Sequence, residues 1–346
     1  MKIMERCRTT ARLLVMSTIL STSFSSALHS QSSSSQPDDS LLATLPHDAS
    51  SLGLNSSQRE ELEQAIRKHE YKLAEQLLVG EANRDPNSIR AARLFETAGG
   101  VFFLDGQYLN SAISWKKAEA IAPLDERSSF TLAMAYIKLG RQDWARQQVE
   151  RLATAKPSNG LYAYWLARLD YDAHNYTSAI ARLQTVVKLD AKMVRAYDLL
   201  GLCYDYLGQP DAAVKNYNLA IQLNRLQSKP SPWPHVDLAV SLMSIDQLGE
   251  AEENLHQALK YDPLLPQAYY QLGRVLEMQE RHKEAVQPLQ QAAALDSSYA
   301  EPHYLLGRIY QKLGENGLAK SEVERFKEIE KNQEKPATTG SDALPK

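Results

Sequence analysis

The chain repeats one pattern of residues seven times in succession, and this limits its possible folds more than any other feature. The segments are 34 residues long, except for one of 38, and they begin at Ala92, Glu126, Gly160, Val194, Pro232, Pro266 and Ala300. A unit of this length cannot bury an apolar face by itself, so successive units must stack to form a continuous core. The repeat, rather than the total length of 346 residues, therefore sets the architecture.

Within each segment, apolar residues recur at the spacing of a helix face. When each segment is numbered from its first residue, positions 4, 7, 8 and 11 are mostly apolar, and so are positions 20, 24 and 27. This spacing predicts two amphipathic helices per segment. Small residues at positions 8 and 20 allow the paired helices to approach closely, and those at position 8 are Gly99, Ala133, Ala167, Gly201, Ala239, Gly273 and Gly307.

The residues that end helices lie at fixed places in the pattern. Position 15 is a glycine in four segments, where the first helix needs a left-handed terminator: Gly106, Gly140, Gly208 and Gly314. A proline near position 32, as at Pro123, stops the second helix. Each segment is therefore predicted to be a helix–turn–helix unit.

These columns resemble the tetratricopeptide repeat, a helix–turn–helix of 34 residues. The closest segments contain Ala268–Gly273 with Glu284 and Ala285, and Pro302–Gly307 with Tyr310. The resemblance runs from Ala92 to about Gln333, and a looser unit precedes it. It implies an all-α, right-handed superhelical solenoid of about eight units.

The expected organisation of the chain follows from the repeat and from composition. Residues 1–27 form a signal peptide, residues 28–54 a disordered Ser/Pro-rich spacer, residues 55–91 a divergent first repeat, and residues 334–346 a disordered tail. A capping-box pattern at Ser57–Glu60 is expected to start the first helix. The seven clear units occupy residues 92–125, 126–159, 160–193, 194–231, 232–265, 266–299 and 300–333.

The N-terminal residues have the pattern of a targeting segment. A basic head precedes the short apolar run Leu13–Leu20, and small residues at Ser25 and Ala27 offer a cleavage site. We expect export to the periplasm or cell envelope, with secretion or organelle targeting as alternatives. Residues 1–27 hold four basic residues and one acidic residue, so cleavage changes the formal net charge from −3 to −6. This balance disfavours nucleic acid as a partner, and no apolar run in the mature chain is long enough to cross a membrane.

Two places depart from the repeat pattern. Asp170 occupies position 11, which is normally apolar. Either the register slips by one, so that Tyr171 takes the position, or a buried carboxylate there has a partner, and we expect the slip. Four extra residues precede the sequence Pro232-Trp233-Pro234. We interpret them as a longer connection with proline in the first helical turn, the alternative being a hinge or binding loop.

The sequence holds no recognisable catalytic, cofactor or metal motif. The Gly-rich phosphate loops, the GxSxG elbow and the HExxH pair are all missing, and the eight histidines are scattered singly. The two cysteines, Cys7 and Cys203, cannot build a disulfide framework, and Cys203 lies in an apolar run that predicts a buried side chain. We therefore expect no enzyme activity, no cofactor and no metal.

The resemblance implies that the first helix of each unit lines a concave surface that takes peptides or partner helices, mainly through positions 2, 5, 9, 12 and 13. Three units carry Tyr at position 5 and Arg at position 9, a spacing that places ring and guanidinium on one helix face. Arg can stack on Tyr and still bind a carboxylate. The candidate groove residues are Arg127, Phe130, Tyr164, Arg168, Arg195, Tyr270, Arg274, Tyr304 and Arg308.

These observations predict a non-enzymatic scaffold that binds a protein or peptide, with an acidic or carboxylate-bearing segment as the expected ligand. Position 9 is never Asn, so the Lys–Asn carboxylate clamp of chaperone-cofactor relatives is missing. One alternative is an accessory subunit of an envelope assembly or secretion machine. Another is a regulatory subunit whose partner supplies the catalysis in trans.

Overall fold

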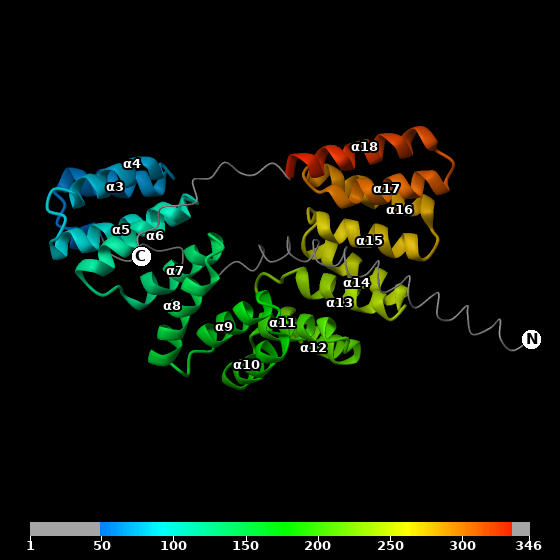
Figure 1. Ribbon diagram of the computed structural model, residues 1–346, viewed down its shortest axis with the longest axis horizontal. Helices are drawn as coiled ribbons and strands as arrows, with labels where there is room; N and C mark the ends of the chain where they lie inside the picture. Colours follow the sequence, from blue (N-terminus) through cyan, green and yellow to red (C-terminus); the bar gives the residue numbers. More distant parts are fainter. Residues whose placement is uncertain (1–48, 334–346) are drawn as a thin grey trace, which may run out of the picture. The chain divides into compact units, whose positions relative to one another are not determined.

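The computed structural model describes residues 49–333, which form sixteen α-helices, α3 to α18, and one short 3-10 helix, η1, without any strand (Figure 1). The predicted all-α architecture is confirmed. The signal peptide, most of the spacer and the tail lie outside the described residues. The chain divides at Ala145/Arg146 into two compact parts, which we call the N-terminal part and the C-terminal part.

The N-terminal part begins with η1 and continues through five helices. They are η1 (Ala49–Leu52), α3 (Ser56–Arg67), α4 (Tyr71–Ala82), α5 (Ile89–Leu104), α6 (Tyr108–Ile121) and α7 (Glu126–Lys138), after which α8 (Gln142–Ala155) crosses into the next part. Leu52 and Leu54 are buried with the apolar faces of α3 to α5. The end of the predicted spacer is therefore ordered, because these two leucines cover the open face of the first helix pair.

The first helix also begins earlier than expected. Its cap is Asn55, which accepts a hydrogen bond from the Gln58 amide at 2.9 Å, while the Gln58 side chain accepts one from the Asn55 amide at 3.1 Å. This reciprocal pair is a capping box two residues before the predicted one at Ser57–Glu60. Asn caps as well as Ser does, and it lies at the position where the chain turns into the helix.

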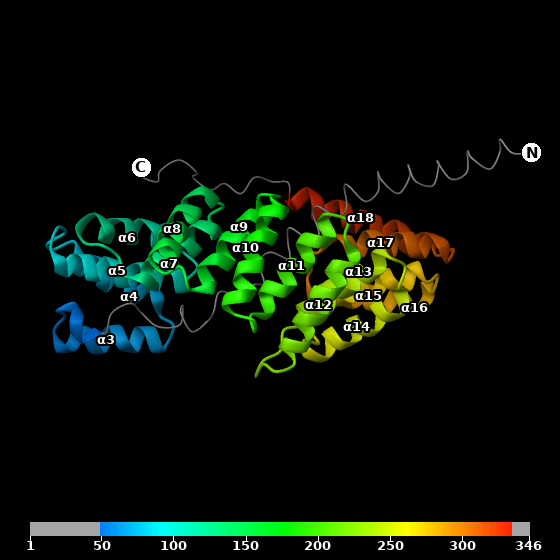
Figure 2. The same cartoon turned by 90° about the horizontal axis from the view of Figure 1, so that it is seen from below.

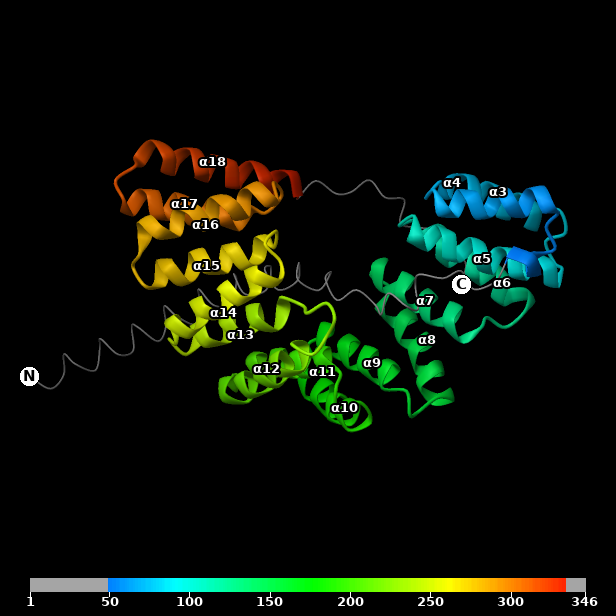
Figure 3. The same cartoon turned by 180° about the vertical axis from the view of Figure 1, so that it is seen from behind.

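The C-terminal part is a run of helical hairpins (Figures 1 and 3). Its helices are α9 (Gly160–Asp172), α10 (Tyr176–Leu189), α11 (Val194–Tyr206), α12 (Pro210–Asn224), α13 (Trp233–Ser244), α14 (Leu248–Tyr261), α15 (Pro266–Met278), α16 (His282–Leu295), α17 (Ala300–Lys312) and α18 (Asn316–Gln333). Each odd-numbered helix contacts the even-numbered helix after it and also the next odd-numbered helix. The first helices of the repeats therefore form one layer in this part.

Glycines at position 8 allow this close pairing. A Cβ atom on Gly201 would lie 2.4 Å from the Tyr217 ring, and one on Gly273 would lie 2.4 Å from Leu289. Both partners occupy position 24 of the same repeat and are fully buried. The small residues predicted at position 8 thus provide the space that the large side chain of the second helix fills.

Position 15 has left-handed backbone in repeats with and without glycine. The glycines Gly106, Gly140, Gly208 and Gly314 have φ between 68° and 79°, as predicted. In the remaining repeats the same turn places other residues at φ of 58° to 62°, which are His69, His174, Asp246 and Glu280. Residues other than glycine normally prefer a negative φ, so the geometry of the turn imposes this left-handed conformation on them.

The register slip expected at Asp170 is wrong. α9 keeps the register of the other first helices, and Asp170 is buried with 5% of its surface exposed. Its carboxylate binds Arg146 Nη1 at 2.8 Å and Arg182 Nε at 2.7 Å. Two charge-assisted contacts offset the desolvation of the carboxylate, so the helix need not shift.

The long connection between α12 and α13 is ordered by a side chain. Asn224 is fully buried. Its side-chain Nδ2 donates a hydrogen bond to the backbone carbonyl of Ser231 at 2.7 Å, and its Oδ1 accepts one from the backbone N–H of Ser231 at 2.8 Å. Pro234 lies in the first turn of α13, as expected. Figure 2 shows the loop extending past the helix ends, and Leu226 at its start is 82% exposed.

Candidate functional site

The predicted groove residues lie in both parts of the chain. Arg127 and Phe130 are on α7 in the N-terminal part, and the other seven are on α9, α11, α15 and α17 in the C-terminal part. Phe130 is only 1% exposed, so it belongs to the core of its part. Arg127 is half-buried. The candidate site is therefore built from the C-terminal residues.

Tyr164 and Arg168 do not form the predicted stacked pair. Tyr164 is 2% exposed, and the guanidinium above its ring, at 4.9 Å, belongs to Arg195 of α11. Arg168 Nε instead binds Asp172 Oδ1 at 3.1 Å, and its guanidinium lies 5.7 Å from the Tyr171 ring. These arginines are held in contacts between and along the first helices.

Tyr270 and Arg274 do form the predicted pair on α15. The Arg274 guanidinium lies 5.9 Å from the centre of the Tyr270 ring, and its Nη1 donates to Gln271 Oε1 at 2.8 Å. Tyr299, at the start of α17, packs edge-on against Tyr270 at 5.2 Å. This ring contact fixes Tyr270, and the half-buried Arg274 keeps donors for a further acceptor.

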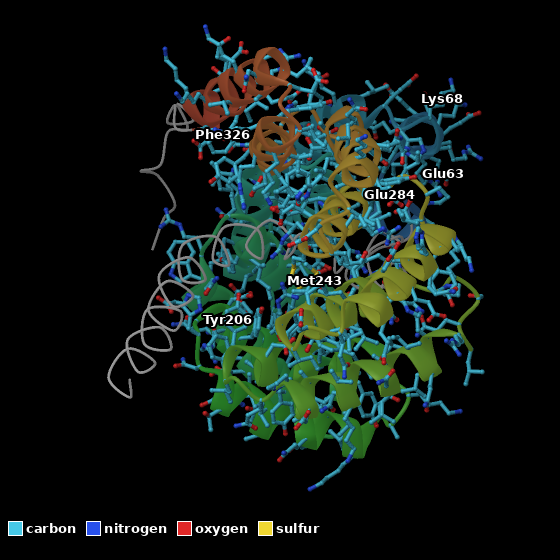
Figure 4. The ribbon with its side chains drawn as sticks, turned by 90° about the vertical axis from the view of Figure 1, so that its right-hand side faces the viewer. Glu63, Lys68, Tyr206, Met243, Glu284 and Phe326 are labelled. Carbon is cyan, nitrogen blue, oxygen red and sulfur yellow. The ribbon has the colours of Figure 1, made fainter. Side chains whose placement is uncertain are left out.

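The neighbouring positions of α17 add exposed positive charge. Arg308 and Lys312 are 50% and 44% exposed, and both bind Glu277 Oε1 of α15, at 3.5 Å and 2.7 Å. Tyr304 is 49% exposed and its ring contacts Phe326 of α18, the residue marked in Figure 4. We call the set Tyr270, Arg274, Tyr304, Arg308 and Lys312 the α15–α17 surface.

Three aspartates that the sequence analysis did not select form a second site on the first helices. Asp198 and Asp205 are on α11, and Asp237 is on α13. Burial raises the pKa of Asp198 to about 7 and that of Asp205 to about 6. Burial, together with the charges of Asp198 and Asp205, raises the pKa of Asp237 well above its ordinary value. We call these three residues the carboxylate cluster.

The members of the cluster differ in their partners. Asp205 is satisfied, since the Ser241 and Tyr217 hydroxyls donate to its two oxygens at 2.7 Å and 2.8 Å. The Oδ1 atom of Asp198 is buried and has no hydrogen-bond partner among the described residues. Asp237 is 6% exposed. The cluster therefore contains desolvated carboxylates that the fold does not fully satisfy.

Aromatic rings lie beside the carboxylate cluster. Tyr171 of α9 packs against Tyr206 of α11 at 5.7 Å, and Tyr206 stacks on Tyr176 at 4.7 Å with an interplanar angle of 11°. Figure 4 marks Tyr206, the last residue of α11, and Met243 near the end of α13. Burial raises the pKa of Tyr171, and the nearby Tyr206 and the charge of Asp237 add to this rise.

The sequence did contain a signal for this cluster. Asp198 and Asp205 occupy positions 5 and 12, two of the positions expected to face the concave surface. Asp237 occupies position 6, which was not among them. The Tyr–Arg pairs recur between repeats, whereas each of these aspartates occurs once in its column, so the repeat pattern predicted the pairs and not the aspartates.

Neither a reactive thiol nor a metal-holding group of side chains is present among residues 49–333. Cys203 is fully buried, as predicted, and burial raises the pKa of its thiol to about 12, so it stays protonated at neutral pH. Among residues 49–333, no group of His, Cys, Asp and Glu is arranged to hold a metal ion. No helix in the same range is long and apolar enough to cross a membrane.

Family comparisons agree with the repeat pattern. A tetratricopeptide repeat model matches residues 236–300, and a second model of this repeat matches residues 194–225 and 300–333. Residues 194–225 and 236–333 are therefore tetratricopeptide repeats. A comparison with curated protein sequences found no match.

Several solved structures share the fold. A tetratricopeptide repeat protein from Parabacteroides merdae is 16% identical, with a TM-score of 0.62 over 73% of this chain and 97% of that one. PilW, a type IV pilus biogenesis factor, is 17% identical, with a TM-score of 0.53 over 58% of this chain and 91% of that one. A chain of the APC/C hetero-tetramer Cut9–Hcn1 is 16% identical, with a TM-score of 0.57 over 72% of this chain and 48% of that one. At these identities the likeness concerns the fold alone.

Proposed function

We propose that the chain is a non-enzymatic scaffold that binds a segment of a partner protein on the layer of first helices. The tetratricopeptide repeats support a role in protein–protein interaction. The α15–α17 surface is the proposed contact, and an acidic or carboxylate-bearing segment is the proposed ligand.

The observation that carries this proposal is the excess of cations on α15 and α17. Arg274, Arg308 and Lys312 lie on two helices in contact, and Glu277 binds two of the three. Arg308 and Lys312 are about half exposed, so a carboxylate can reach them without displacing core residues. Tyr and Arg are also the residue types that most often dominate binding energy at interfaces.

Charge reversal tests the proposal. The double variant Arg274→Glu/Arg308→Glu is used to capture partners from a cell extract, beside the wild-type chain. We expect the captured proteins to be lost, because a ligand carboxylate would then meet two like charges. The matched control is Lys320→Glu/Arg325→Glu, which makes the same charge change on α18 at side chains that are 80% and 64% exposed.

Equal capture by the wild type and the Arg274→Glu/Arg308→Glu variant contradicts the assignment of this surface. Loss of capture by both double variants also contradicts it, since net charge would then explain the result. A carboxamide copy of a captured acidic peptide completes the test, and we expect it to bind more weakly than the carboxylate form.

We further propose export of the chain, with residues 1–27 removed, to a bacterial periplasm or cell envelope. The basic head and short apolar run of the N-terminal sequence support this proposal. N-terminal sequencing of the protein from each cell fraction tests it, and an uncleaved cytosolic product contradicts it. Work as an accessory subunit of an envelope assembly, or as a regulatory subunit of an enzyme, stays an alternative role of the same scaffold.

A further inference from the structure

The carboxylate cluster contains carboxylate oxygens that the residues from 49 to 333 do not fully pair. Asp237 is 94% buried, and none of the described residues forms a hydrogen bond with its carboxylate. Oδ1 of Asp198 is enclosed without a partner. Native proteins rarely leave such groups without a partner, because a buried carboxylate that makes no hydrogen bond is less stable than the same group in water.

Among residues 49–333, Arg168 is the cation whose charge lowers the pKa of both Asp198 and Asp237, and it also binds another carboxylate. It binds Asp172 at 3.1 Å, with 11% of the Arg168 side chain exposed. One guanidinium that pairs with Asp172 cannot also neutralise two further carboxylates. The space beside Asp198 and Asp237 therefore suits one more positive charge.

The walls of the cluster also suit an organic cation. Tyr171 lies beside Arg168 at 5.7 Å and packs against Tyr206, and aromatic faces attract guanidinium and ammonium groups. The carboxylates do not converge as metal ligands do, since no group of acidic side chains in residues 49–333 is arranged to hold a metal ion. A larger cation that spans separate carboxylates fits this arrangement better than a metal.

We propose that the carboxylate cluster binds an arginine or lysine side chain of the partner segment, between α11 and α13. The inference rests on the proposed scaffold function and extends it to a second point of contact. The bound segment would then carry a basic residue at this cluster and an acidic group at the α15–α17 surface. Two opposite charges at separate points would fix the direction of the segment along the layer of first helices.

In the free protein a proton takes the place of the ligand cation. The raised pKa values of Asp198 and Asp237 mean that the pair holds a proton near neutral pH. A guanidinium or ammonium group favours the charged carboxylates, so its arrival lowers these pKa values and releases the proton. Binding should therefore release protons to the solution.

The experiment uses an array of capped peptides of about a dozen residues, in which each position in turn carries arginine or citrulline. Citrulline has nearly the same shape as arginine but no charge. We expect the full chain to prefer arginine by roughly tenfold at one position, which corresponds to about 1.4 kcal/mol. The preference should disappear in Asp198→Asn/Asp237→Asn and persist in Asp211→Asn, a control that removes one carboxylate from the exposed start of α12.

A second measurement keeps the test independent of folding. Both amide substitutions remove buried charge, so the double variant should melt no lower than the wild type, as circular dichroism can show. Calorimetry in two buffers of different ionisation enthalpy should detect proton release for the arginine peptide with the wild type and not with the double variant.

Three outcomes overturn the inference. The first is an equal response of the wild type to arginine and citrulline at every position. The second is an arginine preference that survives Asp198→Asn/Asp237→Asn. The third is equally tight binding of free arginine amide, which would make a small cation the occupant. The two proposals can fail separately. If the wild type shows no preference for arginine over citrulline, but Arg274→Glu/Arg308→Glu still loses the preference for an acidic group in the peptide, the inference about the carboxylate cluster is wrong and the scaffold proposal stands.

Discussion

The residues at position 15 show that the turn between the two helices imposes a positive φ whatever side chain is present. Eight described residues at this position have positive φ, and four of them are not glycine. An L-residue in this conformation places its Cβ too close to the following carbonyl. At each of these four positions, steric strain from the side chain therefore lowers the stability of the folded chain.

We predict that Glu280→Gly stabilises the chain by up to about 1 kcal/mol, because glycine removes the steric cost at φ 60°. The matched control is Gly208→Ala, where nothing lies within 4 Å of the added Cβ and φ is 68°. It should destabilise by about 1 kcal/mol. Urea-unfolding midpoints check both, and shifts of the same sign would contradict the argument.

Asp198 gives a prediction about pH. Its folded pKa of about 7 lies above the ordinary unfolded value of about 4, so the folded state holds a proton that the unfolded state releases between these values. The stability that this group contributes is therefore complete below pH 4 and is lost as pH rises to 7. The charge of Arg168 acts on Asp198, and the charges of Asp198, Asp205 and Arg168 act on Asp237.

For Asp198→Asn we expect a gain in unfolding free energy that is small at pH 4 and grows to about 4 kcal/mol at pH 7, since the amide has no proton to lose and three pKa units correspond to about 4 kcal/mol. Denaturant titrations of both chains across this range measure the difference. A gain that stays constant with pH would show that Asp198 titrates as an exposed carboxylate does.

At the scale of elements, the contact between position 8 and position 24 sets how closely the two helices of a repeat pack. Gly201 admits the Tyr217 ring, and the Tyr217 hydroxyl then reaches Asp205. One glycine on α11 thus determines both a helix–helix contact and the support of a residue in the carboxylate cluster. Buried Asp170 has a comparable role, since it joins α9 to Arg146 of α8 and Arg182 of α10.

We predict that Gly201→Ala destabilises the chain by about 1–3 kcal/mol, because the new methyl group would lie 2.4 Å from a buried ring. Gly249→Ala is the control. It also lies in a helix, α14, and has nothing within 4 Å of its added Cβ, so it should be neutral or slightly stabilising. Thermal melts distinguish the two, and equal tolerance would mean that the α11–α12 pair can relax.

At the scale of the whole molecule, the C-terminal part is a stack in which each repeat is stabilised mainly by contacts with its neighbouring repeats. α18 ends the described stack and contains no buried residue, whereas α13 and α15 contain many. Its charged outer face, marked by Lys320, Arg325 and their glutamate partners, suits a terminal helix that has a neighbour on one side only.

Amide hydrogen exchange should show this gradient. We expect the amides of α18 to exchange at least about tenfold faster than those of α13 and α15, because opening the last helix exposes little apolar surface. Mass spectrometry of peptides from each helix measures the rates. Equal protection along the C-terminal part would indicate that it unfolds as one unit.

The sequence by itself determined the helices, their pairing and the places where small residues and left-handed turns are needed. These features repeat, and a helix period or a glycine in a turn depends on neighbours along the chain. Tertiary structure decided how each charged side chain was used. Asp170 found two arginines, Tyr164 was covered by Arg195, and the three aspartates gathered on α11 and α13. Charge pairing and desolvation depend on residues brought together from different repeats, so the position of an aspartate within its repeat did not by itself predict its burial or its partners.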